Sequence, residues 1–152
     1  MSVKSLLLVE DNPDDIDLTL LCLKKNRIAN EVTVARDGAE ALDYLFCRGA
    51  YSGRDPQDLP AVILLDLNLP KLSGMEVLTQ IRSDPRTQWL PVVIFTTSDE
   101  EKDLARSYSA GANSYIRKPV DLDRFNEAIH NLGLYWVLLN REPPPHAGPH
   151  AI

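Results

Sequence analysis

The sequence predicts an α/β protein built on a doubly wound, five-stranded parallel sheet with helices on both faces. Short apolar runs alternate along the chain with segments in which apolar residues recur at helical spacing. Alternating strands and helices call for a parallel sheet with right-handed crossovers. Acidic residues also follow two of the apolar runs. Since ligands of such sheets bind at the carboxyl ends of the strands, these acids are candidate site residues.

The first strand and the first helix are predicted near the N-terminus. Residues 6–9 form an unbroken apolar run that ends at two acids, which is typical of a strand buried on both faces. Apolar residues then recur at three- and four-residue steps over 16–23, which predicts a helix. Asp14 or Asp15 can cap the start of this helix, and the segment 26–30 ends it.

The middle of the chain repeats this alternation. A strand is predicted at 32–35, followed by a helix whose apolar face runs over 39–46. Segment 48–60 is polar and contains glycines and prolines, so we expect a long loop. The run 61–65 is the most continuous apolar strand, and it stops at Asp66.

The pattern recurs in the second half of the chain. A helix is predicted over 75–81, and the apolar run 91–96 predicts the fourth strand. A more polar helix over 99–110 ends at Gly111, because glycine favours the position after a helix. The fifth strand is predicted at 114–117.

A last helix is predicted to begin near Asp121, which can cap it, and to extend past Gly133. We therefore expect one domain over residues 1–140, which includes this extended helix. The proline-rich tail over 141–152 is expected to be disordered. We expect no second effector domain, because the chain has 152 residues.

Composition narrows the classes of function. The net charge of −6 disfavours direct binding to nucleic acid, which needs clustered positive charge. No apolar stretch reaches the roughly 18 residues of a membrane span, and the N-terminus has no secretory signal pattern. Cys22 and Cys47 match no zinc-binding pattern, so we expect reduced thiols and a cytoplasmic protein.

Three carboxylates are expected to meet at one edge of the sheet. Glu10 and Asp11 follow the first strand, and Asp66 follows the third. Three negative charges repel one another unless a cation balances them, and an all-oxygen site suits Mg²⁺. Any one of these acids, taken alone, is better explained as a solvated loop residue. Their joint position at strand ends favours a magnesium site.

Two further residues are candidates for the same site. Lys118 follows the fifth strand, where its ammonium can offset a carboxylate or a phosphoryl oxygen. Thr96 ends the fourth strand and offers a hydroxyl donor. Alone, Thr96 is an ordinary β-branched strand residue. Together with the acids and the lysine, it completes a candidate site.

These residues form part of a wider resemblance. The sequence resembles the receiver domain of two-component response regulators from about residue 5 to residue 133. The motifs that carry this resemblance are Val9-Glu10-Asp11-Asn12, Leu64-Leu65-Asp66-Leu67-Asn68-Leu69-Pro70, Gly74, Thr96, Gly111-Ala112 and Lys118-Pro119. The resemblance implies a flavodoxin-like sheet with the strand order 2-1-3-4-5.

The resemblance also implies a role for each matching residue. Asp66 would accept a phosphoryl group from a sensor histidine kinase. Glu10, Asp11, Asp66 and the backbone carbonyl of Asn68 would bind Mg²⁺, and Lys118 would contact the phosphoryl group. Such a chain would act as a switch and catalyse only its own phosphorylation and dephosphorylation, so we do not expect an enzyme.

Switching residues follow from the same resemblance. Thr96 would move toward the phosphoryl group, and Tyr115 on the fifth strand would turn inward. The alternative for Tyr115 is an ordinary half-buried strand tyrosine, and the switching role is modestly favoured over it. The peptide bond between Lys118 and Pro119 would be cis, which a residue before proline tolerates best.

Finer features resemble the small regulators that are partnered with bacterial phytochrome kinases. They are the segment 12–15, the long loop 48–60, the residues 96–98 and a tryptophan-bearing last helix. This resemblance implies a light-regulated histidine kinase as phosphoryl donor. It makes Ile16 and Leu20 candidate docking contacts, although core packing explains either residue equally well.

The predicted last helix is more apolar than one packed face requires. Its seam toward the sheet comprises Leu122, Phe125, Ile129, Leu132, Trp136 and Leu139. Leu134, Tyr135 and Leu138 fall largely off that seam, beside Trp136. We therefore expect a homodimer through these four residues, because aromatic side chains are favoured in interface cores. The alternative is that they fold back onto their own domain.

Three rival functions are weighed against the receiver. A phosphatase that forms an aspartyl phosphate would need a second aspartate two residues after Asp66, where this chain has Asn68. A flavodoxin-like electron carrier would need a phosphate loop after the first strand, where Glu10 and Asp11 would repel phosphate. An adaptor that is never phosphorylated remains an alternative.

Overall fold

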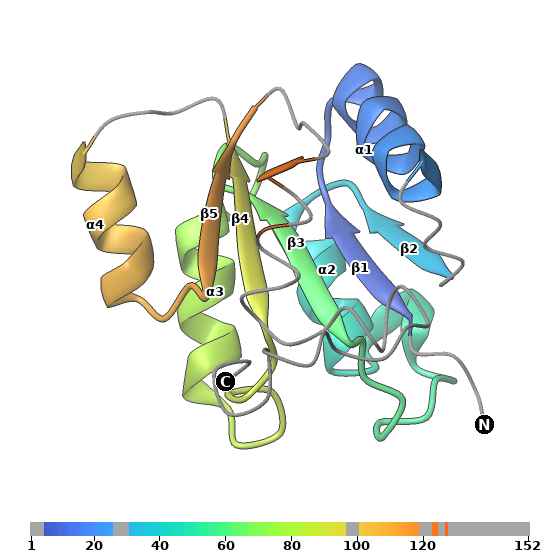
Figure 1. Cartoon of the computed structure of the whole chain (residues 1–152). Helices are drawn as coiled ribbons and strands as arrows, with labels where there is room; N and C mark the ends of the chain where they lie inside the picture. Colours follow the sequence, from blue (N-terminus) through green and yellow to red (C-terminus); the bar gives the residue numbers. More distant parts are fainter. Residues whose placement is uncertain (1–4, 26–30, 97–100, 119–122, 125–126, 128–152) are drawn as a thin grey trace, which may run out of the picture.

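The computed structural model describes residues 5–25, 31–96, 101–118, 123–124 and 127. The chain forms the α/β fold that the sequence predicts (Figure 1). The strands are β1 (Leu6–Val9), β2 (Val32–Ala35), β3 (Val62–Asp66), β4 (Val92–Thr96) and β5 (Ser114–Arg117). The helices are α1 (Pro13–Lys25), α2 (Gly38–Leu45), α3 (Gly74–Ser83), α4 (Glu101–Ser109) and the short 3-10 helix η1 (Gly49–Tyr51).

All five strands are parallel and lie in the order β2-β1-β3-β4-β5, which confirms the predicted order. In the register of the sheet, Val9 lies beside Leu65, and Thr96 lies beside Arg117. The residues that follow β1, β3 and β5 therefore reach the same edge of the sheet. The candidate site residues lie at this edge.

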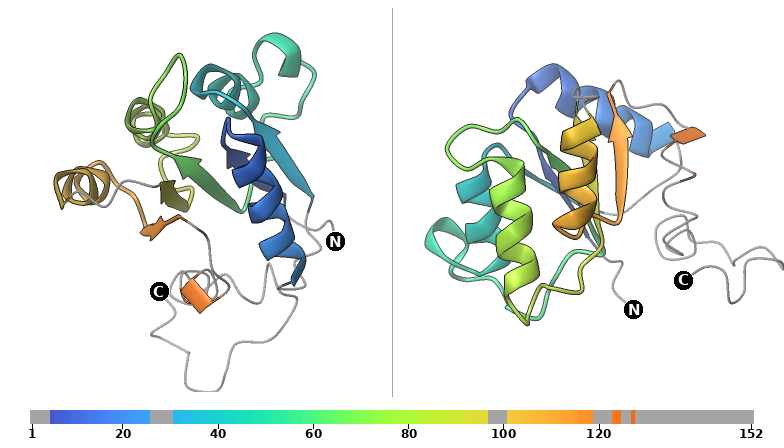
Figure 2. Two further views of the ribbon diagram at one scale, coloured as in Figure 1. Left: turned by 90° about the horizontal axis from the view of Figure 1, so that it is seen from above. Right: turned by 90° about the vertical axis from the view of Figure 1, so that its left-hand side faces the viewer.

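Helices cover both faces of the sheet (Figure 2). Alternate residues of each strand belong to different core clusters, because successive side chains point to opposite faces. Leu6 and Leu8 of β1 pack with residues of α1, whereas Leu7 and Val9 pack with residues of α2 and α3. Strands β1, β3 and β4 are buried along their whole length, as expected for strands covered on both sides.

The start of α1 corrects one prediction. Asn12, and neither Asp14 nor Asp15, caps this helix: its Oδ1 accepts hydrogen bonds from the backbone N–H groups of Asp14 (2.9 Å) and Asp15 (3.1 Å). Pro13 then occupies the first helical position, where its missing N–H costs nothing. Asp14 and Asp15 consequently lie in the first turn of α1, with side chains that the cap does not use.

The segment 48–60 is more ordered than the loop that we expected. It contains the 3-10 helix Gly49–Tyr51. The Arg54 guanidinium lies 3.6 Å from the centre of the Tyr44 ring and donates hydrogen bonds to the carbonyl oxygens of Tyr44 and Asp58. Arg54 lies within the segment and Tyr44 lies on α2, so these contacts hold the segment against α2. The guanidinium stacks on the ring and also satisfies two carbonyl oxygens.

Some predictions concern residues outside those that the structure describes. The tail over 141–152, most of the last helix and the peptide bond before Pro119 are among them. So are the expected dimer contacts, which are Leu134, Tyr135, Trp136 and Leu138. Within the described ranges, no helix is both long and apolar enough to cross a membrane.

Gly74 lets the start of α3 pack against the backbone of Asp66 and Leu67, at the sheet edge that carries the candidate site. The backbone N–H of Gly74 donates a hydrogen bond to the Leu67 carbonyl at 3.0 Å, so α3 begins directly against the end of β3. A Cβ at position 74 would lie 2.2 Å from the carbonyl oxygen of Asp66 and 2.6 Å from the Leu67 Cα. Both are backbone atoms, so no side chain could move aside, and only glycine fits.

Replacing Gly74 with alanine is therefore expected to lower the free energy of unfolding by about 2 kcal/mol, as overpacking does elsewhere. Urea unfolding measures the effect. Gly53→Ala is the matched control, because no heavy atom lies within 4 Å of the added Cβ, and it should change stability by less than about 0.5 kcal/mol. Equal effects of the two substitutions would contradict this account of the Gly74 contact.

Candidate functional site

Glu10, Asp11 and Asp66 come together at the carboxyl edge of the sheet. Each offers a carboxylate oxygen, and these oxygens all lie within 4.8 Å of one another. Glu10 and Asp66 are buried, whereas Asp11 is exposed. Glu10 and Asp11 follow β1, and Asp66 is the last residue of β3, so the parallel pairing of these two strands brings the three acids together.

Lys118 balances part of this negative charge. Its side chain is only 6% exposed, and its Nζ donates a hydrogen bond to the Asp66 Oδ2 at 3.1 Å and another to the Glu10 Oε1. The backbone N–H of Lys118 donates to the Thr96 carbonyl at 2.8 Å, which fixes the lysine where β5 ends. The structure thus brings the predicted lysine to the predicted acids.

Asp15 is a further member of the site that the sequence analysis missed. Its Oδ2 accepts a hydrogen bond from the Lys118 Nζ at 2.9 Å. The sequence analysis treated Asp15 only as a candidate helix cap. The signal lay in Asn12, because a cap at Asn12 places Asp15 in the first turn of α1, next to the edge of the sheet.

Burial and charge shift the ionisation of this cluster. Burial raises the pKa of the Glu10 carboxyl to about 7, and the nearby Asp66 adds to the rise, although Lys118 opposes it. Burial alone would lower the pKa of Lys118, but the carboxylates of Glu10, Asp15 and Asp66 outweigh it and raise the pKa. Lys118 therefore stays charged, while Glu10 exchanges its proton near neutral pH.

Thr96 and Asn68 contact each other next to Asp66. Thr96 is buried, and its Oγ1 accepts a hydrogen bond from the Asn68 side-chain amide at 3.3 Å. The backbone N–H of Asn68 donates to the Asp66 Oδ1 at 3.2 Å. The sequence analysis assigned a role to the Asn68 carbonyl and did not anticipate either contact.

Tyr115, the second predicted switch residue, is half-buried on β5. It packs against the core cluster that includes residues of α2 and α3.

The burial of side chains on α1 changes the prediction of docking contacts for the kinase. Ile16 is 4% exposed and belongs to the core cluster, and Leu20 is partly buried against the same cluster. The interpretation of Ile16 as a docking contact is therefore wrong, because no partner can reach it. Leu18 and Leu21 are the exposed apolar residues of α1, with 52% and 47% of their surface accessible.

The sequence matches the family described as the response regulator receiver domain over residues 6–130. The chain belongs to this family. The receiver has solved relatives such as the bacteriophytochrome response regulator RtBRR, 48% identical with a TM-score of 0.83, where the similarity covers 99% of this chain and 89% of that chain. For the bacteriophytochrome response regulator AtBRR the identity is 51%, the TM-score is 0.82 and the coverage is 93% and 100%. Response regulator Rcp1 of Synechocystis sp. is 38% identical, with 88% of this chain and 89% of Rcp1 covered.

Membership of the family places the receiver in two-component signalling, with a histidine kinase as partner. Receiver domains bind Mg²⁺, and the donors of Glu10, Asp11 and Asp66 fit that ion because they are all carboxylate oxygens. One solved structure of Rcp1 is its Mn²⁺-bound form. The family and the chemistry of the donor set therefore agree on a divalent cation.

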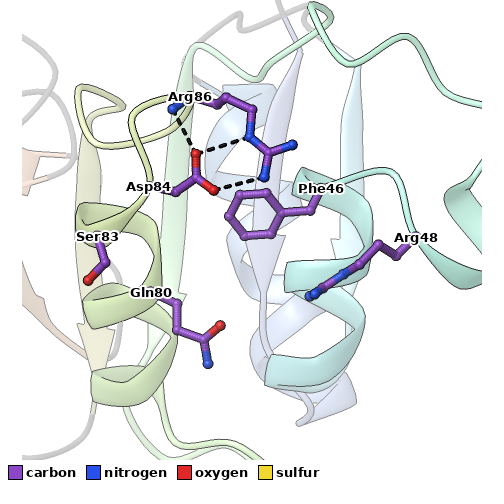
Figure 3. A pocket seen from close by; sticks show the side chains of 6 residues that line it. All are labelled: Phe46, Arg48, Gln80, Ser83, Asp84 and Arg86. Atoms are coloured by element: carbon purple, nitrogen blue, oxygen red, sulfur yellow. Dashed lines mark hydrogen bonds and ion pairs between the residues drawn. The ribbon is translucent and has the colours of Figure 1, made fainter.

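A hollow lies at the C-terminal ends of α2 and α3, away from the carboxylate cluster (Figure 3). Its volume is about 380 Å³. Arg86 lies 4.8 Å from the centre of the Phe46 ring and pairs with Asp84 at 2.8 Å, while Arg48 pairs with Asp43 at 3.5 Å. Because a carboxylate already balances each guanidinium, we assign no ligand to this hollow.

The raised pKa of Glu10 predicts that Mg²⁺ binding depends on pH. Below a pKa of about 7 the Glu10 carboxyl carries a proton that must leave when a cation binds. The apparent affinity for Mg²⁺ should therefore be about tenfold lower at pH 6 than at pH 8. Calorimetry in buffers of different ionisation enthalpy would measure both the affinity and the released proton.

Glu10→Gln serves as the control for this pH dependence, because an amide takes up no proton in this range. The variant should bind Mg²⁺ more weakly and lose most of the dependence between pH 6 and pH 8. A wild-type affinity that is equal at the two pH values would show that Glu10 is not the titrating ligand.

Proposed function

We propose that this receiver is a stand-alone response regulator that accepts a phosphoryl group on Asp66. The environment of Asp66 carries the proposal. Its buried carboxylate accepts hydrogen bonds from the Lys118 Nζ on one oxygen and from the backbone N–H of Asn68 on the other. Two donors on one carboxylate fix its direction, which is what a nucleophile in phosphoryl transfer needs.

The proposed reaction transfers a phosphoryl group from a phosphohistidine. A carboxylate oxygen of Asp66 attacks the phosphorus, the bond from phosphorus to the histidine nitrogen breaks, and that nitrogen leaves with the bonding electrons. Mg²⁺ held by Glu10, Asp11 and Asp66 would neutralise part of the charge on the transferring oxygens. Lys118 supplies a second positive charge at the same edge, and the product is an aspartyl phosphate.

The hydroxyl of Thr96 is the proposed switch element. It accepts a hydrogen bond from the Asn68 side chain at 3.3 Å, next to Asp66. A phosphoryl oxygen on Asp66 would offer the hydroxyl a charged acceptor, which makes a stronger hydrogen bond than a neutral one. Thr96 would then turn from Asn68 toward the phosphoryl group. We propose that Tyr115 responds on the neighbouring strand and that the peptide bond before Pro119 is cis.

Turnover of phosphate esters is the less favoured function. A phosphatase of this chemistry needs a carboxylate two residues after the nucleophile to move a proton. That residue is Asn68, whose amide donates to Thr96 and cannot act as an acid or a base near neutral pH. We therefore propose a protein that catalyses only its own phosphorylation and dephosphorylation. A receiver-shaped adaptor is the alternative if Asp66 never accepts phosphate.

We propose a bacteriophytochrome-type histidine kinase as the donor. The similarity to two bacteriophytochrome response regulators, at 48% and 51% identity, supports this partner. Leu18 and Leu21 are the docking contacts that we propose, because they form an exposed apolar pair on the helix that begins beside the site. Such a kinase draws phosphate from cytoplasmic ATP, which favours a cytoplasmic receiver.

We also propose a homodimer through Leu134, Tyr135, Trp136 and Leu138. The apolar pattern of the sequence supports it, because these side chains exceed what one packed helical face needs. Sedimentation of the full chain at several concentrations tests it. A single monomeric species, with and without phosphorylation, would rule the dimer out.

The phosphorylation site can be tested without the kinase. Incubation with acetyl phosphate and Mg²⁺ should add one phosphoryl mass to the wild-type protein, and Asp66→Asn should abolish the gain because an amide oxygen is a poor nucleophile. Intact-protein mass spectrometry measures both. Asp58→Asn, an exposed loop position, is the matched control and should gain the mass as wild type does. Phosphorylation of Asp66→Asn to the wild-type extent would overturn the assignment.

The kinase-docking proposal predicts a selective defect. Leu18→Glu and Leu21→Glu together should slow phosphotransfer from a purified phytochrome-type kinase at least about tenfold, because each substitution places an unpaired carboxylate in an apolar contact. Phosphorylation by acetyl phosphate should not change. Leu104→Glu on α4, also exposed, is the control. Unchanged transfer from the kinase to the double variant would contradict docking at this pair.

A further inference from the structure

The side chain of Lys118 has one partner that the divalent cation does not share. Its Nζ contacts Glu10, Asp66 and Asp15. Glu10 and Asp66 also supply oxygens to the carboxylate cluster that suits Mg²⁺, whereas Asp15 is not part of that cluster. When the cation is bound, the lysine has to share Glu10 and Asp66 with it. Among the described residues, Asp15 then remains as the carboxylate that pairs with Lys118 outside the cation cluster.

The position of Asp15 is built into the start of α1. The Asn12 side chain accepts a hydrogen bond from the Asp15 backbone N–H at 3.1 Å, which fixes the first turn of the helix. The Asp15 side chain is 30% exposed, whereas that of Lys118 is 6% exposed. Asp15 therefore pairs with the buried ammonium from the side of the site that faces solvent. The adjacent Asp14 shares the same cap but is exposed, and no ion pair of its side chain is recorded within the described ranges.

We propose that Asp15 is a positioning residue for Lys118. It holds the ammonium at the edge of the site while Glu10 and Asp66 bind the cation, and it gives the ammonium up in part when a phosphoryl oxygen arrives. This inference rests on the proposed phosphorylation of Asp66. Asp15 is not one of the three acids of the cation cluster, and its side chain contacts Lys118, so it acts through the lysine.

Two consequences of opposite sign follow from this arrangement. Without the Asp15 carboxylate, Lys118 would rely on Glu10 and Asp66 alone, so it would compete more strongly with Mg²⁺. The loss of the negative charge of Asp15 near the cation would also weaken Mg²⁺ binding. A phosphoryl group would instead bind better, because Lys118 would turn toward it without a competing carboxylate and because one repelling charge is gone.

The test compares Asp15→Asn with Asp14→Asn, which removes the same charge from the same helical turn. Calorimetry at pH 8 measures the affinity for Mg²⁺. Fluorine NMR at saturating Mg²⁺ measures the affinity for beryllofluoride, an analogue of the phosphoryl group. We expect Asp15→Asn to bind Mg²⁺ about three- to tenfold more weakly and beryllofluoride several-fold more tightly. Asp14→Asn should change each affinity less than about twofold, because its charge lies in solvent.

The outcomes separate this inference from the proposed function. If wild type binds beryllofluoride but Asp15→Asn loses affinity for both ligands, the role of Asp15 is merely structural and the inference is wrong. Equal effects of Asp14→Asn and Asp15→Asn would overturn it as well. If the wild-type protein binds Mg²⁺ but neither beryllofluoride nor phosphate, the proposed function fails, and the inference fails with it.

Discussion

The balance of charge around Lys118 is the constraint on which the rest of the site depends. One lysine contacts three carboxylates, two of them almost fully buried. Buried charges are stable only when they are paired and hydrogen-bonded, and one ammonium cannot neutralise three carboxylates. The site therefore carries an excess of negative charge, which favours a divalent cation. Burial, with a smaller contribution from the nearby Asp66 carboxylate, raises the pKa of Glu10. Affinity for Mg²⁺ and readiness to receive a phosphoryl group have the same electrostatic origin.

The fold can tolerate this unfavourable cluster of charges because the charged residues come from separate strands, each of which is stably packed. Parallel pairing of β1 with β3 brings Glu10 next to Asp66, and the end of β5 delivers Lys118 through a backbone hydrogen bond to Thr96. Each residue comes from a strand whose apolar side chains are anchored in two core clusters. The free energy of burying those side chains offsets the cost of the crowded acids. Gly74 allows α3 to begin directly against Asp66.

The sheet and most of the site could be predicted because they depend on periodicity and on strand ends. Apolar runs define the strands, and the residue after a parallel strand must reach the edge where Asp66 and Lys118 lie. The cap of α1 could not be chosen with the same reasoning, because Asn12, Asp14 and Asp15 all have side chains that cap helices. The contact between Asp15 and Lys118 depends on that choice. The bond from Asn68 to Thr96 joins residues 28 positions apart and follows from tertiary packing alone.

The most direct test of this charge balance is the effect of Mg²⁺ on the stability of Lys118→Met, measured by urea unfolding at pH 8 beside wild type. Without the lysine, the carboxylates have no ammonium to pair with, so the variant should be less stable in the absence of the ion by about 3 kcal/mol. Mg²⁺ should then stabilise the variant more than it stabilises wild type, because no ammonium competes for Glu10 and Asp66. An equal or smaller gain in the variant would contradict the account.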